Sequence, residues 1–217
     1  MHALIVVTHP DPNSLTHALA SEVATGAREA GHSAEIADLA AEGFDPRFTA
    51  RDHAVHLLRD MPPAEVLAEQ TRIDRADVLV LAYPVYWWSF PALLKGWIDR
   101  VFINGWAYEE VQGSATVKKL RHLPVVLMAA GGAGERTYAR HGYRDAMRTQ
   151  IEHGIFDYCG ARVVRSELML PPGEGEDWRM RLDAARTIGR DLAQEDAAAQ
   201  QLVEKRGSGR GAFSYAA

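Results

Sequence analysis

The sequence predicts an α/β fold, a doubly wound five-stranded parallel sheet with helices on both faces. Apolar runs of strand length alternate with helical stretches along the chain, and this alternation implies right-handed crossovers between parallel strands. The first run, residues 3–8 (ALIVVT), is continuous and β-branched, as is typical of a strand buried on both faces. The expected strand order is 2-1-3-4-5, which places strands 1, 3 and 4 side by side.

Four further segments complete the predicted sheet. They share short length, apolar character and polar or turn-forming flanks. They are residues 33–39, 77–82, 123–130 and 162–168.

Helices are expected between the strands. The first begins at Asn13 or Ser14, which are both good N-caps, and Leu15 starts its apolar face. Another begins at Pro91, because proline is tolerated in the first turn of a helix. Its apolar stripe is Leu94, Trp97, Ile98, Val101 and Phe102.

Two connections are harder to assign from the sequence. Residues 42–63 contain three prolines and are expected to form an irregular connection before a helix at 64–75. A terminal helix is expected at 178–205, and the Gly/Ser-rich residues 206–217 are expected to form a flexible tail. We therefore predict a single domain, 1–205, followed by that tail.

Composition narrows the function classes. Apolar residues make up 47% and charged residues 24% of the 217 residues, as in ordinary globular proteins. A net charge of −5 favours neither nucleic acid nor an anionic membrane as a partner. Cys159 is the only cysteine, which excludes an internal disulfide and is typical of a cytoplasmic protein. The uncharged residues 78–94 include Pro84 and Pro91, so no membrane insertion is expected.

Three loops of unusual composition, 9–16, 83–90 and 131–141, follow strands 1, 3 and 4. Since the carboxyl ends of neighbouring parallel strands lie together, these loops are expected to form one ligand crevice. The first loop (THPDPNSLTHA) ends at a helix N-terminus, which favours an anion, although helix capping accounts for the same residues. No GxxxxGK[ST] or GxGxxG motif is present, which favours the phosphate of a tightly bound cofactor over ATP.

The second and third loops indicate a flat ligand. The second (YPVYWWSFP) has five aromatic residues within eight positions, in a connection that should lie at the surface, where such rings line a pocket or an interface. The third (AAGGAGERTYARHGY) has glycines that allow close backbone approach. Tyr138 and His141 follow them and could stabilise developing negative charge; a solvated Gly-rich turn is the alternative.

The stretch PVYWWSFPALLKGWIDRVFINGWAY, residues 84–108, resembles the NAD(P)H:quinone oxidoreductases of the flavodoxin-like fold. It is also similar to the ancillary oxidoreductases of bacterial potassium-efflux systems. The likeness extends through ALIVVTHPDPNSLTHA, AEQTRIDRADVLV and GG…RHG. It implies a two-electron reductase that passes hydride from NAD(P)H, through bound FAD (FMN possible), to a quinone or similar acceptor.

The resemblance also implies roles for individual residues. The ribityl and phosphate groups would be held by His9, Asn13, Ser14, Leu15 and Thr16, and the adenosine end by Gln70 across a homodimer. The flavin ring would lie against Pro84, Val85, Tyr86, Trp87 and Trp88, with its pyrimidine edge at Gly131 and Gly132. Tyr138 and His141 would be the catalytic pair, and Tyr108 would enter the partner subunit's substrate pocket.

Other interpretations stay open on the sequence. Ala129 and Ala130 replace hydroxyl residues of the family, and Glu110 stands where relatives carry a second pocket tyrosine, so the acceptor is the least determined feature. An FMN-dependent azoreductase or nitroreductase and a flavin-bound regulatory subunit of a potassium-efflux transporter are the alternatives. His53 and His56 could share a helical face but have no third ligand nearby, so no metal is expected. The aromatics Trp88, Trp106 and Tyr108 suggest a covered interface, and hence a homodimer.

Overall fold

Five parallel strands form the central sheet in the order β2-β1-β3-β6-β7, which confirms the predicted order. The computed structural model describes residues 1–111, 113–173 and 177–208, with the side chains of the last helix described as far as residue 194. The elements are β1 (His2–Val7), α1 (Leu15–Glu29), β2 (Ser33–Asp38), α2 (Ala50–His56), α3 (Ala64–Asp74), β3 (Val78–Pro84), α4 (Ala92–Val101), β4 (Tyr108–Glu109), β5 (Val117–Lys118), β6 (Pro124–Ala130), α5 (Glu135–His141), α6 (Tyr143–Met147), the wide helical segment η1 (Arg148–Asp157), β7 (Arg162–Met169) and α7 (Trp178–Ser208).

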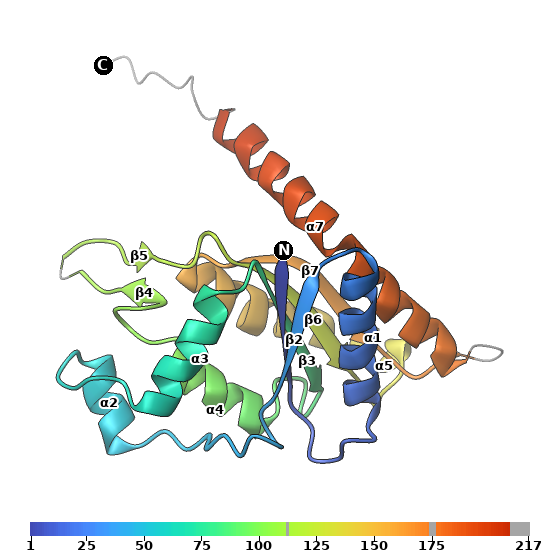
Figure 1. The fold of residues 1–217 in the computed structure, drawn as a ribbon, viewed down its shortest axis with the longest axis horizontal. Coiled ribbons are helices and arrows are strands. Elements are labelled where there is room, and N and C mark those ends of the chain that lie inside the picture. The colour runs from blue at the N-terminus through green and yellow to red at the C-terminus, as the bar shows by residue number, and fades with distance from the viewer. Residues whose placement is uncertain (112, 174–176, 209–217) are drawn as a thin grey trace.

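Helices cover the sheet on both faces (Figure 1), because alternate strand residues point to opposite sides. Leu4 and Val6 of β1 join the core beneath α3, α4 and η1. Ile5 and Val7 join the core beneath α1 and α7. Every residue of β3, the central strand, is buried. The carboxyl ends of the strands lie along the lower edge in Figure 1, which is where the predicted crevice must be.

Two glycines allow α1 and α7 to pack with their backbones in contact. A methyl group at Gly26 would lie 2.0 Å from the carbonyl oxygen of Arg186, and one at Gly189 would lie 2.1 Å from that of Val23. Glu29 fastens the same pair of helices, because Arg186 and Arg190 both donate to its carboxylate. These hydrogen bonds lower the pKa of Glu29 to about 2.

Replacing one of these glycines should therefore destabilise the fold. Gly189→Ala forces the helices apart or bends them, and we expect a loss of about 1–3 kcal/mol in the free energy of unfolding. Urea denaturation measures this loss. Gly134→Ala is the control, because its added methyl group meets nothing within 4 Å, and it should change stability by less than about 0.5 kcal/mol. Equal midpoints for the two variants would contradict the close helix crossing.

The structure corrects three expectations. Residues 42–63 are not irregular throughout, because α2 forms within them. The helix begins with a capping box in which the Thr49 and Asp52 side chains accept hydrogen bonds from each other's backbone amides. Phe102 is the C-cap of α4 and not part of its helical stripe. The helix α7 continues to Ser208, three residues into the predicted tail; residues 209–217 lie outside the described part of the chain.

A buried arginine joins three helices on the α4 side of the sheet. Arg100 donates to Asp52 of α2 at 2.9 Å and to Glu65 of α3 at 2.9 Å. A third donor reaches the backbone oxygen of Asp45 at 2.8 Å. Asp52 and Arg100 are only 3% and 5% exposed. Each charge is therefore neutralised inside the protein, and the connection before α3 is fixed to the core.

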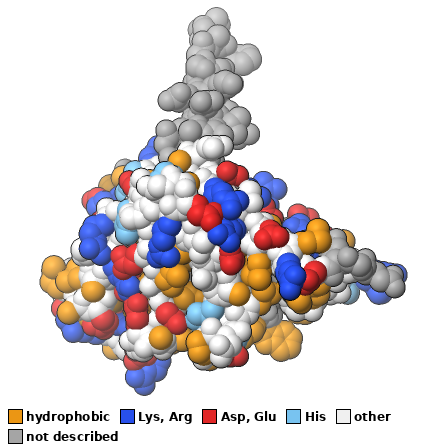
Figure 2. Space-filling model, turned by 45° about the vertical axis from the view of Figure 1, so that its right-hand side comes forward, with side chains coloured by type: hydrophobic (Ala, Val, Ile, Leu, Met, Phe, Trp, Pro, Cys, Tyr) orange, Lys and Arg blue, Asp and Glu red, His pale blue; other side chains and the backbone are white. Residues whose placement is uncertain are grey.

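The surface carries charge of both signs. On the face drawn in Figure 2, basic and acidic side chains are interspersed over the described residues and do not gather into one basic patch. Among the described residues, no helix has the length and apolar character that crossing a bilayer requires.

Candidate functional site

The three predicted loops meet at one edge of the sheet. The amide of Thr8 donates to the Ala82 carbonyl at 3.2 Å, which joins the end of β1 to β3. The amide of Val85 donates to the Ala130 carbonyl at 2.8 Å, which joins the end of β3 to β6. The sheet order thus places the loops after β1, β3 and β6 side by side, as the sequence predicted.

The first loop is shaped by its own polar side chains. The Asp11 amide donates to Nδ1 of His9 at 3.1 Å, and the Asp11 carboxylate accepts from the Asn13 amide at 2.9 Å. Ser14 is the N-cap of α1 and accepts from the His17 amide. Capping therefore does account for the Ser14 side chain, while Asn13 stays exposed.

Two residues of this loop that were predicted to hold the cofactor have side chains packed inside the protein, so only their backbone groups can contact a ligand. The side chain of Leu15 packs on the core between α1 and the sheet, and Thr16 is buried. Because the first amides of a helix have no partner within it, their N–H groups are the contacts these two residues can offer an anion. A hollow of about 340 Å³ lies beside the start of α1, lined in part by Asn13, Ser14 and His17 but not by Leu15 or Thr16.

His17 also lies at the start of α1, although the sequence did not indicate it as a site residue. Its Nδ1 lies 2.9 Å from the Ser14 hydroxyl and its Nε2 lies 2.9 Å from the Asp38 carboxylate. Burial raises the pKa of Asp38, but hydrogen bonds from His17 and the Ala41 amide outweigh it, so the net pKa is below its usual value. The imidazole is therefore held in place at the start of α1.

A buried hydroxyl at the end of β1 has no partner. Thr8 is 2% exposed, and its Oγ1 makes no hydrogen bond within the described residues. An unpaired buried hydroxyl is costly, so an oxygen or nitrogen of a bound molecule at this strand end would relieve it. The sequence did not indicate Thr8 as a site residue, because it is the last residue of a predicted buried strand.

The second loop makes a tight turn with aromatic residues at its tip. Trp87 and Trp88 have φ of 51° and 55°, and Tyr86 and Ser89 exchange backbone hydrogen bonds on either side of them. Positive φ at both central positions defines a type I′ turn, which normally has Gly or Asn there. Trp87 is 89% exposed. Strained backbone and an exposed indole at a strand end are typical of a ligand-binding loop.

The third loop brings Tyr138 against the glycine pair. A methyl group at Gly131 would lie 2.6 Å from Cδ2 of Leu170 and 2.7 Å from the Tyr138 hydroxyl, so a side chain there would displace both, whereas Gly132 faces open space. Tyr138 and His141 both lie on α5, but Tyr138 is buried and His141 is exposed. Burial raises the pKa of Tyr138, which keeps its hydroxyl protonated as a donor at neutral pH.

Gln70 lies away from this crevice. It is 5% exposed on α3, and its Nε2 donates to the Val101 carbonyl at the end of α4, at 3.0 Å. Within the chain, its side chain thus supports the packing of two helices. Its predicted contact with adenosine across a dimer stays a prediction.

Tyr108 lines a separate cavity of about 630 Å³. Its hydroxyl lies 3.4 Å from the ring nitrogens of His56, and burial raises its pKa to about 12. Burial also raises the pKa of Cys159 to about 11, so this thiol stays protonated. The remaining lining residues are Phe48, His53, Ile98, Asp99, Phe102, Gly154, Ile155 and Tyr158. Among described residues, no group of three or more His, Cys, Asp or Glu is placed to hold a metal ion.

The aromatics that suggested an interface are largely covered within one chain. Tyr108 is buried, Trp106 packs on the core and its Nε1 donates to Asp74 at 3.2 Å, and Trp88 is half-buried. These three rings therefore do not need a partner subunit to cover them, contrary to the expectation from the sequence, and the homodimer stays a prediction that they do not support.

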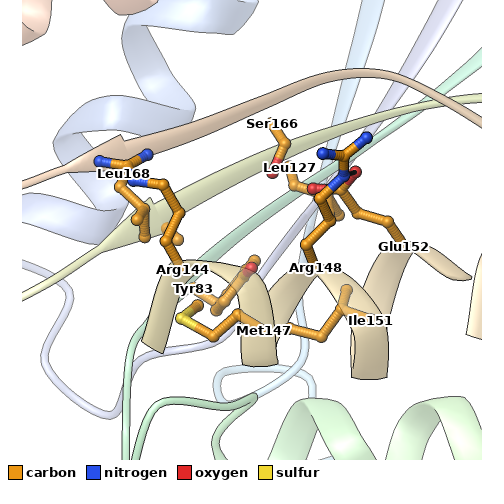
Figure 3. A pocket seen from close by; sticks show the side chains of 10 residues that line it. Tyr83, Leu127, Arg144, Met147, Arg148, Ile151, Glu152, Ser166 and Leu168 are labelled. Atoms are coloured by element: carbon orange, nitrogen blue, oxygen red, sulfur yellow. Dashed lines mark ion pairs between the residues drawn. The ribbon is translucent and has the colours of Figure 1, made fainter. Parts of the chain in front are cut away.

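A small cavity lies between η1 and the sheet (Figure 3). Tyr83 and Met147 point into it, and Arg148 and Glu152 form an ion pair of 3.8 Å at its side. Its volume is about 160 Å³, which is below the usual range of about 300–1,000 Å³ for a ligand pocket. It is too small for a three-ring cofactor, and the crevice at the strand ends remains the candidate site.

A doubly wound sheet with converging loops at its carboxyl edge defines the class of the protein, and the comparisons identify its family. Residues 1–192 match the family described as Flavodoxin-like fold, and the chain belongs to that family. The NAD(P)H:quinone oxidoreductase from Methanothermobacter marburgensis has a similar structure, with a TM-score of 0.80 and 28% identity over 88% of this chain and 98% of that one.

Two curated relatives agree with that structural match. Ribosyldihydronicotinamide dehydrogenase [quinone] of Pongo abelii is 26% identical over 78% of this chain and 81% of its own length. An uncharacterized NAD(P)H oxidoreductase of Haemophilus influenzae is 29% identical over 77% of this chain and 83% of its own. The resemblance to NAD(P)H:quinone oxidoreductases is thereby confirmed, as is the expectation of an oxidoreductase of the NAD(P)H dehydrogenase (quinone) type.

Proposed function

We propose that the chain binds FAD in the crevice formed by the loops after β1, β3 and β6, and uses it to pass electrons from NAD(P)H to a quinone-like acceptor. The observation that carries the proposal is the Gly131–Tyr138 contact, which lies next to the aromatic turn at the end of β3. A flat ring could lie along exposed backbone there with a hydroxyl donor at its edge.

The residues present fit a flavin. The unpaired Thr8 hydroxyl and the first amides of α1 suit the polar chain and phosphate of the cofactor. Backbone at the strained turn and at Gly132 leaves room for the ring system. A bound flavin supplies the capacity to accept hydride from a nicotinamide and to donate it to a second molecule.

The chain's own residues orient the reactants and hold protons. Tyr138, whose pKa is raised by burial, donates a hydrogen bond towards developing negative charge without losing its proton. His141 is solvent-exposed on the last turn of α5 and would donate a second hydrogen bond to the same developing charge. Tyr108 and its cavity, provided by the second subunit of a homodimer, would receive the acceptor.

Flavin binding is the direct test of this proposal. At a free FAD concentration 100 times its Kd, the folded state should gain about 2.7 kcal/mol, seen as a rise in Tm by scanning fluorimetry. We expect a yellow preparation, near one FAD per chain, and a smaller rise with FMN. NADPH and a quinone are then added to the loaded protein to measure turnover. A colourless protein whose Tm responds to neither flavin would refute the proposed function.

A further inference from the structure

Tyr143 lies at the centre of an aromatic cluster that joins the second and third loops. Its ring stacks on Trp88 with centroids 3.8 Å apart and planes 25° apart. It also stacks with His141 at 5.2 Å and 27°. Tyr138 meets it edge-on at 6.4 Å. One side chain thus contacts three residues of the candidate site from two different loops.

The backbone between α5 and α6 accounts for this position. Gly142 has φ of 67° and serves as both the C-cap of α5 and the N-cap of α6. A left-handed residue at this point favours glycine and reverses the chain direction locally. The first residue of α6, Tyr143, is thereby placed beside the last residue of α5, His141. The two rings stack although only one residue separates them.

The stack restricts a histidine that little else holds. His141 is exposed, and within the described ranges of the chain no hydrogen bond or ion pair fixes its imidazole. An exposed side chain of this kind samples several rotamers. The face of the Tyr143 ring limits those rotamers to the ones in which the two rings stay nearly parallel.

The same ring supports the strained turn of the second loop. Trp88 has a left-handed backbone with φ of 55°, a conformation that is costly for a bulky residue and persists only when its surroundings hold it. The stack with Tyr143 is the closest ring contact in the cluster. Loss of this ring would free both the turn and the imidazole.

We propose that Tyr143 is a positioning residue for flavin reduction, which acts through the face of its ring on His141 and Trp88. The proposal rests on the proposed function above. Since the stacked contacts involve the ring alone, the Tyr143 hydroxyl is dispensable. Phenylalanine should therefore replace this residue, whereas leucine, of similar apolar character but with no flat face, should not.

The test compares Tyr143→Leu with Tyr143→Phe. In anaerobic stopped-flow experiments with NADPH, we expect Tyr143→Leu to lower the limiting rate of flavin reduction about tenfold, the scale of one to two lost ring contacts. Tyr143→Phe should keep the rate within about twofold. The Kd for FAD, measured by fluorescence quenching, should change less than the rate in both. In the cofactor-free chain, near-UV circular dichroism should lose the Trp88 contribution in Tyr143→Leu only.

A double variant distinguishes the positioning of His141 by Tyr143 from a general loss of order in the site. In a His141→Ala chain, Tyr143→Leu should lower the rate by no more than about threefold, because His141 is already absent and only the support of Trp88 is left to lose. A full tenfold loss in that background would overturn the action of Tyr143 on His141. Wild-type reduction rates in Tyr143→Leu would overturn it as well and leave the proposed function intact. A wild-type chain that binds no flavin would refute the proposed function first, and this proposal with it.

Discussion

Asp52→Ala should destabilise the protein by about 3–5 kcal/mol, because it leaves the Arg100 guanidinium buried without its main partner. The two groups are 2.9 Å apart and almost fully buried. Arg100 keeps Glu65 and the Asp45 carbonyl, but Glu65 is more than half exposed and cannot replace a buried carboxylate. Asp52 also completes the capping box of α2, so that helix loses its N-terminal cap.

Urea denaturation of matched variants measures this effect. Asp99→Ala on α4, the helix that carries Arg100, removes a solvent-exposed pair with Lys95 and should cost less than about 0.5 kcal/mol. If Asp52→Ala is no more destabilising than Asp99→Ala, the buried pair does not stabilise the protein as argued.

The Asp52 pair also predicts a pH dependence. Burial raises the pKa of Asp52, but hydrogen bonds from Thr49 and Arg100 outweigh it and leave the pKa below its usual value. A lowered folded-state pKa stabilises the protein above the unfolded-state value, about 3.9, and this stabilisation is lost as pH falls through the folded-state value. The difference in stability between the wild type and Asp52→Asn should therefore shrink below about pH 4.

His141→Ala should slow flavin reduction by NADPH by roughly ten- to a thousandfold, about 1.4–4 kcal/mol in the barrier. A donor aimed at charge that develops during the reaction lowers the barrier more than it strengthens resting binding. FAD occupancy should therefore stay near that of the wild type. Tyr138→Phe removes one hydroxyl and should have a smaller effect.

A second exposed histidine provides the control for this experiment. His153 on η1 is 77% exposed and pairs with Asp157, and it lies outside the three loops of the crevice. His153→Ala should reduce its flavin at the wild-type rate in stopped-flow measurements. If His141→Ala does so too, the histidine has no catalytic role and is a solvated residue at the end of α5.

The strands and the crevice could be predicted because their signals are local. Continuous apolar runs mark β1 and β3 whatever surrounds them, and adjacent parallel strands must bring their following loops together. The helix α2 was missed because its capping box, from Thr49 to Asp52, lies between prolines that indicate irregular structure. Its fixed position depends on Arg100, far along the chain.

The least predictable features depend on three-dimensional contacts. No sequence pattern predicts the left-handed conformations of Trp87 and Trp88, because this type of turn normally has glycine or asparagine at those positions. In the sequence, Tyr143 is one more residue after a Gly-rich loop. Only the structure shows that its ring stacks on Trp88 and His141. The same holds for Gln70, whose amide faces the end of α4.

The length and direction of α7 have a practical consequence. Its 31 residues span about 46 Å at 1.5 Å per residue, whereas the 15 residues of α1 span about 22 Å. The helix starts near the carboxyl edge of the sheet and runs past the opposite edge (Figure 1). A surface linker attached at the end of α7 would therefore anchor the protein on an electrode with its crevice facing the solution, open to nicotinamide and acceptor.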